Sequence, residues 1–381
     1  MLRTRSVFLS FRAFTIRRAF SSVAPAQRFE EKDDLHRGSH YARIPERGVL
    51  EIEGPDTAKF LQGLTTNHMP LIAAGGDGFF TAFLTPQGRM LYDTFIYPVN
   101  VGVNFPHPKF VIECPKSSTS TLLKHLKRYV LRSKVKIRDA SEEYSLYSVW
   151  GDALVHGPGG EEKNVPTGSL VKGTKRISDI GCMDPRVPGF GYRAVLPQDK
   201  DIKSIVSSLG DYAELPETEY TIRRILHGIP EGVHDIWPEQ SLPLESNFDY
   251  MNGVDFRKGC YVGQELTIRT YHTGVVRKRI VPVQFFDEDE SFPEKISVNR
   301  DTSYPSSLEP RMDIKSTDAS KKRGAGKLGS GIHNIALAIM RLEDVQKAVN
   351  DKNSFVVPHA QQSGLRLRPF VPEWWPVEPR E

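Results

Sequence analysis

The sequence predicts an α+β fold of antiparallel strands with helices between them, followed by a small C-terminal β-barrel. The first observation behind this prediction is the order of the patterns: strand-like runs come in pairs, and helix-like runs separate the pairs. The second concerns motifs, because the chain contains neither the glycine-rich fingerprint of dinucleotide-binding domains nor a P-loop. We therefore expect antiparallel layers and no nucleotide-binding parallel sheet.

The elements follow one another in a regular order. An apolar run at 49–52 predicts a strand, and a turn at 54–56 joins it to a short helix. Two β-rich runs within 79–99 flank the sequence TPQG, which indicates a hairpin. Further patterns predict an amphipathic helix at 117–133, strands at 134–140, 144–151 and 188–197, and helices at 201–210 and 217–230.

The sequence pattern changes again after residue 273. Two β-rich runs, 275–285 and 333–345, lie on either side of a long polar stretch. We expect an α+β region at 41–272 and a C-terminal β-barrel at 273–381, with a disordered insertion around 287–327.

The first twenty residues have the composition of a mitochondrial targeting helix. They contain five arginines and no acidic residue, and apolar residues, serine and threonine lie between the arginines. The sequence RRAFSS resembles a matrix-protease site with a cut after Phe20. We expect a presequence at 1–20, a flexible lead at 21–40 and a location in the mitochondrial matrix.

This basic segment accounts for the charge of the chain. The net charge is +4, and the first twenty residues contribute +5, so the remaining residues are near −1. Composition therefore gives no reason to expect nucleic acid or an anionic membrane as a partner. No apolar run reaches the ~18 residues typical of a membrane span.

The cysteines limit the metal chemistry. There are three, Cys114, Cys182 and Cys260, with no C-x-x-C pair and no disulfide-like spacing. This usage is typical of a reducing compartment such as the matrix. A self-contained iron–sulfur or zinc site with four cysteines is excluded by the count.

Cys260 has the most informative neighbours. Gly259 and Gly263 permit tight or left-handed turns around it, and Arg257 and Lys258 are cations that would favour its thiolate. A buried cysteine packs as a small hydrophobe, but polar and charged neighbours argue against a core position here. A nucleophile would need a base, and no histidine spacing provides one. A metal ligand would need further ligands from a partner protein.

The sequence KGCYVGQE (258–265) resembles the hallmark of YgfZ-type proteins, relatives of the folate-dependent aminomethyltransferase (T-protein) of the glycine cleavage system. Supporting stretches occur in the order of the family: FLQGLTTN (60–67), PQGRMLYD (86–93), RRILHGIPE (223–231) and LPLESNFD (242–249). The resemblance spans roughly 40–345 and implies three lobes in a cloverleaf arrangement around a central pocket.

Together with the presequence, the resemblance implies the mitochondrial member of this family, which assists late iron–sulfur cluster assembly. The implied partners are an A-type carrier and client [4Fe–4S] and radical-SAM apoproteins. Cys260 would then be a ligand of a transient cluster shared with the carrier, a role that suits a soft thiolate. The motif loop implied by the resemblance comprises Lys258, Gly259, Tyr261, Gly263, Gln264 and Glu265, of which Gln264 and Glu265 would fix the loop by hydrogen bonds.

Departures from the transferase pattern argue against catalysis. The T-protein has paired aspartates where this chain has Tyr92-Asp93, and Asp-Phe where this chain has Cys260-Tyr261. The segment 184–193 also lacks the glutamate that holds the folate. We therefore assign no catalytic residue.

Two alternatives remain open from the sequence. One is a tetrahydrofolate-dependent one-carbon transferase, whose folate pocket would contain Asn67, Asp93, Arg223 and Glu265. The other is a redox-sensing protein that forms a reversible adduct at Cys260.

Overall fold

The computed structural model describes residues 32–73, 75–99, 108–151, 154, 177–318, 323–358 and 364–376. The predicted presequence and the first part of the predicted lead lie outside these residues. Within them, no helix is both long and apolar enough to cross a membrane.

The first sheet is antiparallel, with the strand order β3-β4-β5-β2-β6. Its strands are β2 (Arg47–Glu53), β3 (Phe79–Leu84), β4 (Met90–Pro98), β5 (Lys109–Pro115) and β6 (Lys136–Asp139). The accompanying helices are α1 (Thr57–Gln62), α2 (Thr119–Tyr129) and the short 3-10 turns η2 (Met69–Leu71) and η3 (Lys116–Ser118). Leu122 and Leu126 lie four residues apart on α2, so both reach the same core as Leu50 and Ile52 of β2.

The second sheet has the order β10-β1-β7-β9-β8 and is antiparallel except for the pair β1–β10. Its strands are β1 (His40–Arg43), β7 (Tyr144–Trp150), β8 (Ile180–Met183), β9 (Tyr192–Pro197) and β10 (Ala213–Leu215). The short helix α4 (Ile202–Val206) buries Ile202 and Val206 in the core of this sheet, beside Val149 and Tyr192. The 3-10 turn η1 (Asp34–His36) precedes β1.

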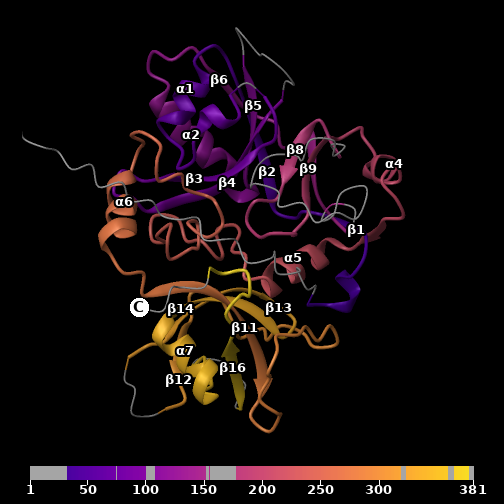
Figure 1. Ribbon diagram of the computed structural model, residues 1–381, viewed down its shortest axis with the longest axis vertical. Helices are drawn as coiled ribbons and strands as arrows, with labels where there is room; N and C mark the ends of the chain where they lie inside the picture. The colour runs from indigo at the N-terminus through magenta and orange to yellow at the C-terminus, as the bar shows by residue number, and fades with distance from the viewer. Residues whose placement is uncertain are drawn as a thin grey trace, which may run out of the picture. The chain divides into compact units, whose positions relative to one another are not determined.

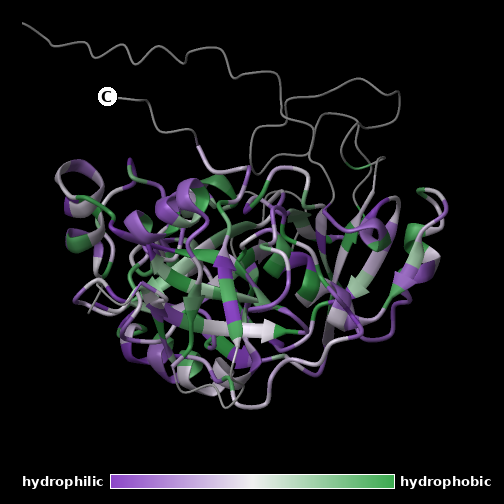
Figure 2. Ribbon diagram, turned by 90° about the horizontal axis from the view of Figure 1, so that it is seen from below, coloured by the Kyte–Doolittle hydropathy of each residue, from purple (hydrophilic) through white to green (hydrophobic). Residues whose placement is uncertain are grey.

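Two helices follow the sheets in the chain, α5 (Glu217–Leu226) and α6 (Gln264–Thr273). Ile222 and Ile225 of α5 pack in one cluster with Leu337 of the C-terminal part, and α5 also contacts β1. Helix α5 therefore lies between the second sheet and the C-terminal part (Figure 1). Figure 2 shows hydrophilic and hydrophobic residues side by side on the helices, as expected for helices with one buried face.

The C-terminal part is a closed barrel with the strand order β11-β14-β13-β12-β15-β16. Its strands are β11 (Lys278–Asp287), β12 (Asp313–Ser316), β13 (Gly326–Ile332), β14 (Ile335–Arg341), β15 (Phe355–Val356) and β16 (Leu365–Pro369), and α7 (Leu342–Asp351) follows β14. Val345 and Ala348 of α7 join the barrel core, which also contains Val281 and Leu328. The predictions of an α+β fold and of a C-terminal β-barrel are confirmed.

The polar stretch 287–327 differs from its prediction as a disordered insertion, because strand β12 lies within it. Only Ile314 of this strand is fully buried, while Asp313 and Lys315 are exposed. With one apolar residue in four, the sequence of β12 does not indicate a strand. Its strand conformation is stabilised by pairing with β13 and β15.

Candidate functional site

The three cysteines lie in different environments. Cys114 in β5 and Cys182 in β8 are buried, whereas Cys260 is exposed, and all three are free thiols. Burial raises the pKa of Cys114 to about 12 and the pKa of Cys182 well above its ordinary value. Neither buried thiol is therefore available as a thiolate, and Cys260 is the thiol that a metal or a reagent can reach.

Cys260 lies in the segment 255–263, here called the Cys260 loop, which leads directly into α6 (Figure 1). Three features hold this loop against the rest of the molecule: the side chain of Lys258, backbone hydrogen bonds on both sides of the cysteine, and a close backbone contact at Gly263.

The side chain of Lys258 reaches into the segment 62–67. Its Nζ donates hydrogen bonds to the carbonyl oxygens of Gln62 (2.9 Å), Thr65 (2.6 Å) and Asn67 (2.8 Å). Because an ammonium group has three N–H donors, all of them are used. Burial disfavours the charged form and lowers the pKa of Lys258, whereas the charge of Asp255 and the three carbonyl acceptors, which need three N–H donors, favour the ammonium form.

The sequence had suggested that Lys258 would favour the thiolate of Cys260. The structure instead uses its ammonium group to bind the segment 62–67. Its ammonium group has no donor left for Cys260, and it also lies 4.8 Å from the ring centre of Tyr261. Arg257 is exposed, and its backbone N–H donates to Asp255 Oδ1 at 2.8 Å. Of the two cations predicted to favour the thiolate, only Arg257 still presents its side chain to solvent beside the cysteine.

Backbone hydrogen bonds extend this contact with the segment 62–67. The N–H of Val262 donates to the carbonyl of Gly63 at 3.0 Å, and the N–H of Asp255 donates to that of Thr66 at 3.1 Å. Together with Lys258, the loop satisfies the carbonyls of Gln62, Gly63, Thr65, Thr66 and Asn67. The FLQGLTTN and KGCYVGQE sequences are therefore the two halves of one contact.

Gly263 packs against the hairpin turn between β3 and β4. It precedes α6 with φ +80°, and a Cβ atom there would lie 2.2 Å from the carbonyl oxygen of Thr85. Across the contact, a Cβ on Gly88 would lie 2.8 Å from the carbonyl oxygen of Gly263. Both positions need glycine, because the two backbones touch and both φ values are left-handed.

The remaining loop residues divide into supporting and exposed ones. Tyr261 is buried, and its N–H donates to Oε1 of Gln264 at 3.1 Å. Glu265 is exposed on the first turn of α6, and Gly259 is exposed with no atom within 4 Å of an added Cβ. Cys260 and Gly259 thus form an open surface that is exposed to solvent, while Lys258, Tyr261 and Val262 beside them are held by buried or hydrogen-bonded contacts.

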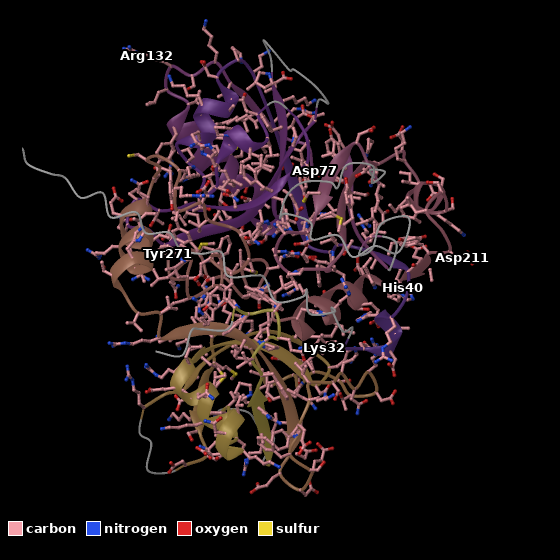
Figure 3. The ribbon with its side chains drawn as sticks, viewed as in Figure 1. Lys32, His40, Asp77, Arg132, Asp211 and Tyr271 are labelled. Carbon is pink, nitrogen blue, oxygen red and sulfur yellow. The ribbon has the colours of Figure 1, made fainter. Side chains whose placement is uncertain are left out.

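An aromatic contact borders this surface. Tyr271, labelled in Figure 3, lies on α6 and stacks on Phe256 with ring centres 3.6 Å apart, while 43% of Tyr271 stays exposed. The stacking joins the start of the Cys260 loop to the last turns of α6, and it leaves an aromatic edge open to a partner.

The four residues of the alternative folate pocket do not share one surface. Asn67 is buried, and its Nδ2 donates to the carbonyls of Phe80 (2.9 Å) and Asn252 (3.0 Å). Asp93 and Arg223 are buried in ionic and aromatic contacts, and Glu265 faces solvent. Arg223 donates to the carbonyl of Phe190 at 2.6 Å and lies over the rings of Phe190 and Trp150.

Asp93 belongs to a buried ionic network that sequence reasoning missed. Arg47 bonds Asp93 (2.8 Å) and Glu113 (2.6 Å), and Arg193 bonds Glu113 through two nitrogens. Glu231 then accepts from Arg193 at 3.1 Å. The network connects β2, β4 and β5 of the first sheet to β9 of the second. The available signal was a charged residue within otherwise apolar strands, as at Asp93 in β4, Glu113 in β5 and Arg193 in β9.

The network continues to Arg186, which donates to Glu231 at 2.7 Å and pairs with Asp184. Burial alone would raise the pKa of Glu231, but Arg193 and Arg186 hold it well below its ordinary value. Burial raises the pKa of Asp93, and Arg47 opposes this shift. These groups neutralise one another and hold the two sheets together.

A second charged cluster comprises Asp33, His36 and Glu219, whose ligand atoms lie within 4.8 Å of one another. Nη2 of Arg300 donates to both carboxylates, and His36 Nε2 lies 2.9 Å from Glu219. Because a guanidinium group already supplies the positive charge, the cluster is an ion-pair contact rather than a metal site.

The chain is similar in sequence to known proteins over most of its length. Residues 277–377 match the family model described as the CAF17 C-terminal beta-barrel domain. A protein of Neosartorya fischeri named iron-sulfur cluster assembly factor IBA57 homolog, mitochondrial, is 44% identical over 321 residues, which cover 80% of this chain and 70% of the relative. The protein of the same name from Aspergillus oryzae is 37% identical and covers 94% of this chain and 87% of the relative.

The chain belongs to the family of IBA57 homologs. The fold of the chain is also found outside this family. The glycine cleavage system aminomethyltransferase T from Bartonella henselae matches it with a TM-score of 0.60 and 12% identity, covering 89% of this chain and 86% of the other. The predicted T-protein-like fold is confirmed by this structure, and the predicted membership of the mitochondrial iron–sulfur cluster assembly family is confirmed by the IBA57 homologs.

Proposed function

We propose that this protein is a mitochondrial iron–sulfur cluster assembly factor in which Cys260 supplies one thiolate ligand to a cluster shared with a partner. The observation that supports it most is the position of Cys260: it is the one exposed thiol among the three cysteines, and it lies on a loop fixed on both sides. The relatives in the family carry the name iron-sulfur cluster assembly factor, mitochondrial, which agrees with this role.

The number of ligands requires a partner. Iron–sulfur clusters are held by about four thiolate ligands, and this chain offers a single accessible one. The cluster is therefore cargo, held between two proteins for the time of transfer. We infer that the partner is an A-type carrier and that client [4Fe–4S] and radical-SAM apoproteins receive the cluster late in maturation, as the family resemblance implies.

The open surface suits such an exchange. Gly259 leaves space beside the thiol, so a partner backbone can approach closely. Binding to iron deprotonates the thiol, so cluster binding at Cys260 releases a proton and weakens at low pH. We infer that this exchange takes place in the mitochondrial matrix, where thiols are kept reduced.

The buried contacts argue against the folate-dependent transferase. Asn67 and Asp93 use their polar atoms inside the molecule, and Glu265 lies on the surface. A ligand in a central pocket would have to replace these bonds. We therefore propose no catalytic residue and no one-carbon transfer.

The test is anaerobic reconstitution. The protein is mixed with an A-type carrier holding a [2Fe–2S] cluster, and visible absorption and native mass spectrometry follow the complex. We expect a coloured heterodimer with wild type and with Cys114→Ala, which keeps Cys260, but none with Cys260→Ser at an unchanged melting temperature. A coloured complex that forms equally well with Cys260→Ser would contradict the proposal.

A further inference from the structure

We propose that Lys258 is a positioning residue for cluster binding: its ammonium group joins three backbone carbonyls of the segment 62–67 and thereby fixes the place of Cys260. This inference rests on the proposed function of Cys260. It gives Lys258 a role different from lowering the pKa of the thiol, because its three donors are used elsewhere.

One acceptor, the carbonyl of Gln62, belongs to the last residue of a helix, and the other two lie in the segment that follows it. Helix α1 ends at Gln62, and the last carbonyls of a helix have no partner within the helix. Lys258 Nζ lies 2.9 Å, 2.6 Å and 2.8 Å from the carbonyls of Gln62, Thr65 and Asn67. A cation is favoured at this end because carbonyl dipoles point toward it, and hydrogen bonds from a charged donor are strong.

The position of the cysteine follows from two attachment points. Lys258 is attached through its side chain, and Val262 through its N–H to Gly63, so Cys260 lies midway between them. Cys260 is exposed, while Lys258 and Val262, two positions before and after it, are held by hydrogen bonds. This arrangement presents a thiol to a partner with little conformational entropy left to lose on binding.

The chemistry of the acceptors also explains why lysine is needed. Three carbonyl oxygens converge on one nitrogen, which suits an ammonium group with three donors around a single atom. The guanidinium group of arginine is planar and places its donors on different nitrogens, so Lys258→Arg should not restore the contact.

The test uses Lys258→Ala and a small cation that replaces the missing part of the side chain. Hydrogen–deuterium exchange at the Val262 amide measures opening of the loop, and the anaerobic carrier assay measures the shared cluster. Lys127→Ala on the exposed face of α2 is the control for loss of one positive charge. Propylammonium chloride is compared with sodium chloride at equal ionic strength.

We expect the Val262 amide of Lys258→Ala to exchange at least about ten times faster than in wild type, because the loss of even one hydrogen bond from a charged donor changes the opening equilibrium by about this factor. The amount of carrier complex should fall in parallel. Propylammonium should restore both, sodium neither, and Lys127→Ala should behave as wild type. Unchanged exchange, or a complex that forms normally despite an opened loop, would overturn the inference. Failure of wild type itself to form the complex would instead count against the proposed function, and exchange would still decide whether Lys258 holds the loop.

Discussion

At the scale of single residues, the buried charged side chains pair with one another and hold the two sheets together. Arg186 and Arg193 are both fully buried, and Glu231 accepts a hydrogen bond from each of them. Buried ion pairs add little net stability by comparison with apolar packing, but removing one partner leaves the others uncompensated.

We predict that Glu231→Gln lowers the free energy of unfolding by about 3–5 kcal/mol, because two buried arginines lose a carboxylate. Urea titration measures this change. Glu143→Gln is the control, since Glu143 pairs with Arg138 on the surface, where ion pairs contribute little. Equal stability of the two variants would show that the network is not needed for folding.

Residue chemistry near Cys260 could be predicted only in part. The glycines and the polar neighbours pointed to an exposed functional loop, and the structure places Cys260 on the surface. The contact of Lys258 could not be predicted, because its acceptors are backbone carbonyls almost two hundred positions earlier. A carbonyl has no side-chain identity, so no sequence pattern marks it as a partner.

At the scale of elements, the position of α6 depends on the contact between the turn before it and the β3–β4 hairpin turn. The turn at Gly263 lies against the β3–β4 hairpin turn at Gly88, and Leu266 of α6 also lies within contact of Gly88. The Cys260 loop is therefore aligned by the first sheet at both of its ends, through the segment 62–67 and through this hairpin.

We predict that Gly263→Ala lowers the unfolding free energy by about 1–3 kcal/mol, because its φ of +80° and the carbonyl of Thr85 leave no room for a methyl group. The carrier complex should weaken in parallel. Gly259→Ala is the matched control, since an added Cβ there meets nothing within 4 Å, and its stability should equal that of wild type. Thermal unfolding of both variants decides; a stable Gly263→Ala would contradict the role given to this turn.

Element prediction succeeded where periodicity was strong. The amphipathic pattern at 117–133 predicted α2, and the TPQG turn predicted the β3–β4 hairpin. It failed for β12, whose pairing partners supply what its sequence lacks. The ionic network was also missed, because a single charge in a strand shows no partner until the sheets are assembled.

At the scale of the whole molecule, one charged contact joins distant parts of the chain. Asp33 and His36 near the start of the described residues meet Glu219 of α5 and Arg300 of the segment between β11 and β12. Burial alone would raise the pKa of Glu219, but hydrogen bonds from Arg300 and His36 outweigh it and lower the pKa to about 2.

This shift predicts a defined pH dependence. A carboxylate whose pKa is lowered by folding adds stability above its unfolded pKa of 4.5 and loses that contribution as the pH falls toward 2. Wild type should therefore exceed Glu219→Gln in unfolding free energy at pH 5, and the difference should shrink as the pH falls below 4.5. Urea unfolding across this range measures it, and a difference independent of pH would contradict the assigned contact.

The central claim is that the sulfur of Cys260 bonds iron, and selenium can report this bond directly. Cys260 is replaced by selenocysteine, the anaerobic complex with the cluster-bearing A-type carrier is formed, and X-ray absorption is measured at the selenium edge. We predict an iron atom in the first shell around selenium, which disappears when the cluster is removed by a chelator. A complex that forms normally but shows only carbon around selenium would contradict the account, and Cys260 would then be a contact residue without a metal.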